Sequence, residues 1–193
     1  MTTLYKKLAN GKIVLMTFLL VAGFAAYLFP TYSAGYRQPT DPDVIDLQLS
    51  FSHERFTQIV SLWLAHKGEA AISAFQSTLI VLDIAFPLIY ATFLAALFAW
   101  LSPVMDAVLN RKQQALFCIP YLAAAMDLIE NAIHYSLFSK ISSTSLGGLS
   151  AQSILAASIF ASIKMILIGV SLLTSVFYAL RLAARWLRGK LIS

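Results

Sequence analysis

The stretch AAAMDLIENAIHY (residues 123–135) contains charged, amide and imidazole side chains among residues that are otherwise mostly apolar. One face of an α-helix has the spacing i, i+3, i+4, i+7, and here it carries Asp127, Glu130, Asn131 and His134. A charged group inside a bilayer is costly unless it is paired or hydrated. We therefore predict that this polar face points toward other helices of a bundle and not toward lipid.

The composition of the whole chain is that of a membrane protein. Hydrophobic residues make up 59% of the 193 residues, charged residues only 12%, and the mean hydropathy is +0.76. Soluble domains carry about 25% charged residues. The net charge of +5 does not indicate nucleic-acid binding, because the basic residues cluster beside apolar segments, where they meet anionic lipid head groups. With one cysteine, Cys118, the chain can build neither an internal disulfide framework nor a cysteine zinc site.

Four segments are long enough to cross a bilayer, which takes roughly 20 apolar residues. They cover about residues 13–29, 72–101, 115–138 and 151–180, and we treat residues 1–193 as a single membrane domain. The linker 30–71 contains an amphipathic segment at about 52–67, with Ser52 as a predicted N-cap and Gly68 as the end. The predicted fold is all-α: an integral membrane bundle of four transmembrane helices with an outer amphipathic helix.

Basic residues are distributed unequally between the two sides of this predicted bundle. Nine fall on the side of the termini, namely Lys6, Lys7, Lys12, Arg111, Lys112, Arg181, Arg185, Arg188 and Lys190, against Arg37, Arg55, Lys67 and Lys140 on the other. This bias predicts that both termini are cytoplasmic. The first segment also resembles a signal peptide with small residues before Gly35, and cleavage there would leave three spans.

The second and fourth spans carry charges at a depth similar to that of Asp127. At about 1.5 Å per residue, Asp83 and Lys164 both fall near the middle of their spans. Pro87 has no N–H to offer the carbonyl of residue i−4, which is Asp83, so a helix kink is expected there. Such a kink either makes a proton or cation site or simply bends the helix. Tyr90 lies on the same helix face as Asp83 and Pro87.

The charges predicted at this depth do not balance. Three carboxyls (Asp83, Asp127, Glu130) face one ammonium, that of Lys164. Burying two surplus negative charges is far more costly than protonating a carboxyl or admitting a cation, so we expect one or the other. The alternative is a purely structural ion pair between Lys164 and either Asp83 or Asp127 that holds the helices of the bundle together.

Carboxylate and imidazole side chains on one helix face are also possible ligands of a metal ion. The di-metal bundle pattern pairs Glu with His at i+3 on two helices, whereas Glu130 and His134 are four apart and have no second copy. We therefore expect no metal and no cofactor. Neither a phosphate-binding glycine loop nor a G-x-S-x-G motif occurs in the sequence.

Two segments together carry a resemblance to a family. The order LDIAFPLIY (residues 82–90), then DLIEN (residues 127–131), then Lys164, resembles an uncharacterised family of small four-span bacterial membrane proteins with L-D-x-x-F-P-x-x-Y and D-x-x-E-N segments. The resemblance covers about residues 46–164. It implies a multi-pass protein of the bacterial plasma (inner) membrane and a shared polar core, without a known activity. His134 is not part of the shared pattern.

The leading functional expectation is binding or movement of a lipid-like or small amphipathic ligand with linked protonation. The residues expected to bind ligand or proton are Asp83, Tyr90, Asp127, Glu130, Asn131 and Lys164. One alternative is a membrane enzyme that acts on an isoprenoid or fatty substrate, with Asp127, Glu130, Tyr90 and His134 as catalytic candidates. Another is an accessory or assembly subunit with a structural polar core. The expected partners are the lipid bilayer and a hydrophobic small molecule, without nucleic acid; a protein partner is left open.

Overall fold

The computed structural model describes residues 2–38, 52–102, 111–141 and 149–192. In these ranges the chain is helical and has no β-strand, which confirms the predicted all-α class for the described residues. Residues 39–51, a large part of the predicted linker 30–71, lie outside the described residues.

The first apolar segment forms a continuous helical rod that is longer at both ends than the predicted span 13–29. It consists of α2 (Gly11–Gly23), a π-helical turn η1 (Phe24–Leu28) and α3 (Phe29–Ser33). The side chain of Asn10 caps its start by accepting a hydrogen bond of 2.9 Å from the backbone N–H of Lys12. Pro30 has no N–H to donate to the turn before it, and the helix widens into the π-helical turn just upstream.

The second apolar segment is broken into two helices. They are α5 (Glu69–Val81) and α6 (Ala85–Leu101), and their axes differ by 41°. Pro87 lies in the first turn of α6, and the break at residues 82–84 includes Asp83, four residues before it. The bend expected from the sequence is present, because Pro87 cannot complete the helical hydrogen bond to the Asp83 carbonyl.

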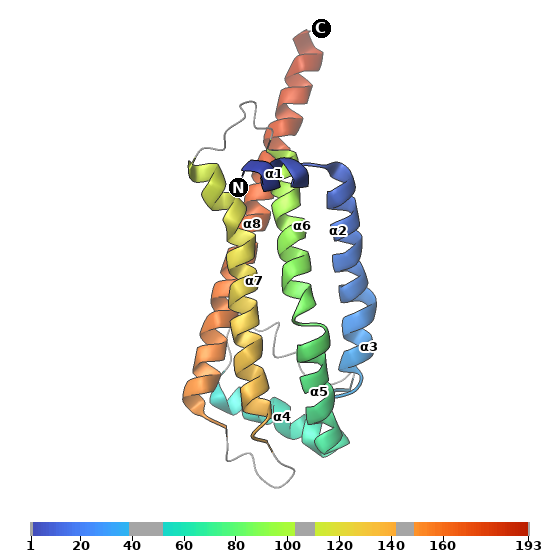
Figure 1. The fold of residues 1–193 in the computed structure, drawn as a ribbon, viewed down its shortest axis with the longest axis vertical. Coiled ribbons are helices and arrows are strands. Elements are labelled where there is room, and N and C mark those ends of the chain that lie inside the picture. The colour runs from blue at the N-terminus through green and yellow to red at the C-terminus, as the bar shows by residue number, and fades with distance from the viewer. Residues whose placement is uncertain (1, 39–51, 103–110, 142–148, 193) are drawn as a thin grey trace.

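The last two helices are long and pack along each other. They are α7 (Arg111–Phe138) and α8 (Ala151–Ile192). With 42 residues, α8 is about 63 Å long, roughly twice the thickness of a bilayer's hydrocarbon core. Its last turns extend past the bundle (Figure 1). The helix therefore continues beyond the end of the predicted span 151–180, through the basic C-terminal residues.

A separate helix, α4 (His53–Lys67), lies across the end of the bundle opposite the two termini (Figure 1). Its bounds agree with the predicted amphipathic helix. The Ser52 hydroxyl accepts a hydrogen bond from the backbone N–H of Arg55 at 3.1 Å, and Gly68 ends the helix with a φ of 62°. Its apolar face is buried against the bundle; it carries Phe56, Ile59, Val60 and Trp63.

The outer surface of the helices is strongly apolar. Leu19, Ile166 and Leu173 expose 59%, 63% and 71% of their surface. Soluble proteins rarely expose apolar surface over a whole bundle in this way. Among the described residues, three helical segments are long and apolar enough to cross a membrane, and the bent α5–α6 pair meets the same criterion when taken together. The chain is therefore a membrane protein.

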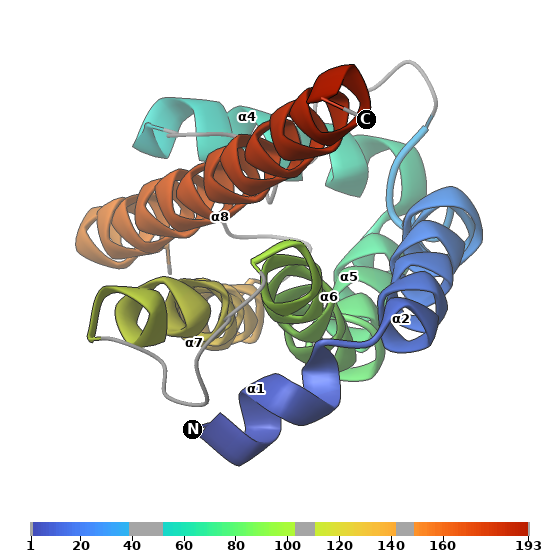
Figure 2. The ribbon, with the colours of Figure 1, turned by 90° about the horizontal axis from the view of Figure 1, so that it is seen from above.

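The helices of the bundle surround a central contact between α6 and α7. α6 also packs against α2 and α8, while a short N-terminal helix, α1 (Thr2–Leu8), crosses the end of α6 (Figure 2). α3 continues the line of α2 and packs against α5. This arrangement places the bend of the α5–α6 pair beside the polar face of α7.

Candidate functional site

Lys164 of α8 lies between two carboxylates of α7. Its Nζ is 2.7 Å from Oε2 of Glu130 and 3.1 Å from Oδ1 of Asp127. Glu130 is completely buried, and the other two side chains are nearly so. Ala157 and Ala161 of α8 are also fully buried, and small side chains of this kind let two helices approach closely. One ammonium therefore joins two acids that are neighbours on one helix face.

Asn131 links the polar face of α7 to the break between α5 and α6. Its Nδ2 donates a hydrogen bond of 3.0 Å to the backbone carbonyl of Asp83. In a regular helix this carbonyl would accept a hydrogen bond from the backbone N–H of residue 87, but Pro87 has no N–H. The Asn131 amide thus provides a hydrogen-bond donor to the buried Asp83 carbonyl, which has no donor at residue 87 of its own segment. The same hydrogen bond holds the Asp83 segment against α7.

Tyr90 of α6 completes the near surroundings of Asp127. The residue is buried, and its hydroxyl lies close enough to the Asp127 carboxyl to interact electrostatically, although not with the geometry of an ordinary hydrogen bond. Asp127 is therefore approached by an ammonium from α8 and by a phenol from α6.

His134 lies in a different environment from the other members of its helix face. Its ring stacks at 6.1 Å from that of Phe56 and lies 6.4 Å from that of Phe75. Both rings belong to the aromatic core that holds α4 on the bundle, together with Trp63 and Phe138. The four-residue polar face predicted from the sequence is thus divided between a charged group and an aromatic core.

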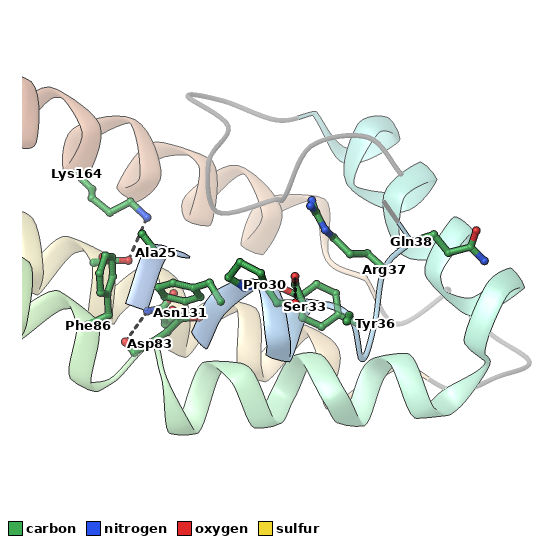
Figure 3. Close-up of a pocket in the computed structure, with 13 residues that line it drawn as sticks. Ala25, Pro30, Ser33, Tyr36, Arg37, Gln38, Asp83, Phe86, Asn131 and Lys164 are labelled. Atoms are coloured by element: carbon green, nitrogen blue, oxygen red, sulfur yellow. Dashed lines mark hydrogen bonds and ion pairs between the residues drawn. The ribbon is translucent and has the colours of Figure 1, made fainter. Parts of the chain in front are cut away.

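The charged group forms one end of a cavity of about 580 Å³. Asp83, Asp127, Asn131 and Lys164 line that end, and Ala25, Phe29, Pro30 and Phe86 line the walls. Arg37 and Gln38 lie at the opposite end, away from Lys164 (Figure 3). Along the helical rod, eight residues separate Ala25 from Ser33, which both line the cavity, and this corresponds to roughly 12 Å.

The walls of this cavity were not predicted from the sequence. Ala25 and Phe29 belong to the first span and carry no polar atom in their side chains, so their spacing gave no signal of a site. Arg37 is recognisable in the sequence, because it is the first charged residue after that span. Arg37 is half-buried, and its guanidinium group is a cation at the end of the cavity opposite Lys164.

The electrostatics of the site depend on its buried charges. Lys164 can neutralise one carboxylate, whereas Asp83, Asp127 and Glu130 are all buried around or beside it. Full ionisation would leave negative charge in a medium of low dielectric constant, where it is much more costly than in water. The arrangement can take up protons, and it can hold the polar end of a bound molecule.

Among the described residues, no three His, Cys, Asp or Glu side chains are grouped so that they could hold a metal ion. No family model, curated protein or solved structure matches this chain.

Proposed function

We propose that this protein binds a lipid-like or small amphipathic molecule in the cavity between the first span and helices α5–α8, and that binding is linked to protonation of the Asp127–Glu130–Lys164 group. The observation that carries the proposal is the combination of a charged end with apolar walls in one cavity. Its volume of about 580 Å³ lies within the range of roughly 300–1,000 Å³ typical of small-molecule sites.

The distribution of polar groups supports an amphipathic occupant. Asp83, Asp127 and Lys164 offer acceptors and a donor at the inner end, while Phe29 and Phe86 offer apolar surface beside it. A wholly apolar ligand would leave the charges without solvation, and a wholly polar one would gain little from the walls. A molecule with one polar end and an apolar body matches both.

The proposed topology is four transmembrane crossings, with the α5–α6 pair as one bent span. Both ends of the described chain lie at the same end of the bundle (Figure 1), as an even number of crossings requires. Basic residues are concentrated at that end in the sequence, which favours a cytoplasmic location of both termini in the inner membrane of a bacterium.

The proposal is tested by native mass spectrometry of the full chain, purified in mild detergent from the membrane in which it is expressed. We expect an amphipathic molecule to be retained and its retention to change between about pH 5 and pH 8, where a buried carboxyl titrates. Asp127→Asn should remove or displace that pH dependence.

A cavity-filling variant separates binding in the cavity from binding elsewhere. Ala25→Trp places an indole in the cavity without replacing a charged residue, and the matched control Leu19→Trp places one on the exposed surface of α2. Retention should be lost in the first variant and kept in the second. The absence of any retained molecule from the wild type over this pH range, or equal retention in both variants, would contradict the proposal.

A second function is favoured by the position of Tyr90 beside Asp127. A phenol and a carboxyl together could act as general acid and base on a hydrophobic substrate. Turnover of the retained molecule that Asp127→Asn abolishes, with helicity and thermal melting unchanged, would identify an enzyme. Retention without chemical change over long incubation would favour binding alone.

A further inference from the structure

A second cavity, of about 150 Å³, lies at the end of the bundle that holds the termini. It is formed where α6 ends, α7 begins and the long helix α8 passes both. Its polar lining comes from Ser102, Gln113, Tyr178, Arg181 and Arg185. The volume is well below the roughly 300 Å³ at which sites for whole small molecules begin, so the cavity suits one small polar group.

The side chains of this cavity are mainly donors. Arg181 and Arg185 are four residues apart on α8 and share one helix face, where two like charges repel each other unless an anion lies between them. Gln113 approaches from the beginning of α7, whose first turns carry the positive end of the helix dipole. No carboxylate belongs to the described residues that line the cavity. A guanidinium fork binds a phosphate group through two parallel hydrogen bonds.

The carbonyl of Ser102, the C-cap residue of α6, already accepts one hydrogen bond. The hydroxyl of Tyr5 donates a hydrogen bond of 2.5 Å to the Ser102 carbonyl, and this bond ties α1 to the end of α6. Burial raises the pKa of the Tyr5 hydroxyl, so the group remains a donor at any physiological pH.

The arginines of this cavity lie outside the hydrocarbon core of the bilayer, on the side of the termini. Seventeen residues separate Lys164 from Arg181, which is about 26 Å along the helix. Half of the hydrocarbon core measures roughly 15 Å, so Arg181 lies beyond the acyl chains when Lys164 is near the midplane. Trp100, the next-to-last residue of α6, is 51% exposed and lies at the end of the helix, where tryptophan favours the membrane interface.

We propose that this cavity binds the phosphate of an anionic phospholipid head group between Arg181, Arg185 and Gln113. The apolar side chains of Leu101 and Leu182 border the same cavity and provide a surface for the adjoining glycerol and acyl carbons. Because free phosphate has the same chemistry, the experiment must separate the two sources. The site is distinct from the Lys164 cavity, and its test does not depend on the function proposed for that cavity.

The experiment is native mass spectrometry of the full chain in detergent, titrated with phosphatidylglycerol and, separately, with zwitterionic phosphatidylcholine. One phosphatidylglycerol should bind per chain, at least about tenfold more tightly than phosphatidylcholine, because both lipids offer a phosphate but the choline ammonium of the second cancels its net charge and is repelled by the two guanidinium groups. In Arg181→Gln/Arg185→Gln, this preference should fall by about tenfold or more. The control is Arg188→Gln, which removes one arginine charge about one turn further along the same face of α8, outside the described lining of the cavity.

A third arm adds inorganic phosphate as competitor. Displacement of phosphatidylglycerol by millimolar phosphate, with phosphate alone binding in dependence on both arginines, would overturn the assignment to a lipid. An equal loss of preference in Arg188→Gln, or no preference in the wild type, would overturn the site itself. Arg181 and Arg185 are exposed, so the double variant is expected to fold. Gln113→Leu, which removes a donor without changing the charge, gives an independent variant in which the same preference should weaken.

Discussion

Removal of the Lys164 ammonium should reveal whether the buried acids depend on it. In Lys164→Met, the carboxyls of Glu130 and Asp127 lose the cation that lies 2.7 Å and 3.1 Å from their oxygens. Breaking a buried ion pair from one side typically costs about 3–5 kcal/mol, because a charge is left without compensation. We expect a loss of this size in the free energy of unfolding at pH 8.

The loss should shrink as the pH falls. Without Lys164, a buried carboxyl can remain in the folded protein by holding a proton, whereas in the unfolded chain it ionises above about pH 4. Folding of the variant then takes up protons, and its stability falls as the pH rises. Each carboxyl that stays protonated contributes about 1.4 kcal/mol per pH unit. The difference between the variant and the wild type should therefore be smaller at pH 6 than at pH 8.

The measurement is reversible unfolding by SDS in mixed micelles, followed by circular dichroism at both pH values. Lys140→Met is the matched control, because Lys140 is exposed at the end of α7 and its removal should change stability by less than about 1 kcal/mol. Adding Asp127→Asn and Glu130→Gln to Lys164→Met should restore much of the lost stability. The reasoning would be refuted by a loss that is the same at both pH values, or by an equal loss in the control.

Two further predictions concern the backbone. Asn131→Leu should lower the free energy of unfolding by about 1–3 kcal/mol, because it leaves the Asp83 carbonyl without its donor. The loss should be smaller in a Pro87→Ala background, where residue 87 regains an N–H. An equal loss in both backgrounds, measured by SDS titration, would contradict this explanation. Gly35→Ala should destabilise by about 1–3 kcal/mol, because the new Cβ would lie 2.9 Å from the Cβ of Ala74. Gly23→Ala, where nothing lies within 4 Å, is its control in thermal melting, and equal melting temperatures for the two variants would count against the packing argument.

The sequence determined the local features of this protein because they depend on near neighbours in the chain. The spacing of apolar residues predicted α4, and Ser52 and Gly68 predicted where it begins and ends. Pro87 predicted the bend, since it lacks an N–H four residues after Asp83. The composition predicted a membrane protein, because charged residues are too few to cover a soluble surface.

The distribution of the polar face between two environments was decided only by the tertiary structure. Asp127 and His134 share a face of α7, yet seven residues of helix separate them by about 10.5 Å, so one ammonium cannot reach both. Periodicity gives the direction of a side chain around its own helix, but not what the next helix places opposite it. Here α8 places Lys164 against Asp127 and Glu130, while α4 and α5 place Phe56 and Phe75 against His134.

The cavity also arises only from the packing of distant segments. Its walls include Ala25 and Phe29, whose apolar side chains are indistinguishable in sequence from residues that face lipid. The widened turn before Pro30 and the bend before Pro87 lie in two different helical segments, and both segments contribute to the same cavity as Lys164. The sequence thus determined which helices form and that charges are buried among them, because helix formation and the cost of a charge in lipid are local. The choice of partners and the space between them required the tertiary structure, because both depend on distances between segments that the chain order does not specify.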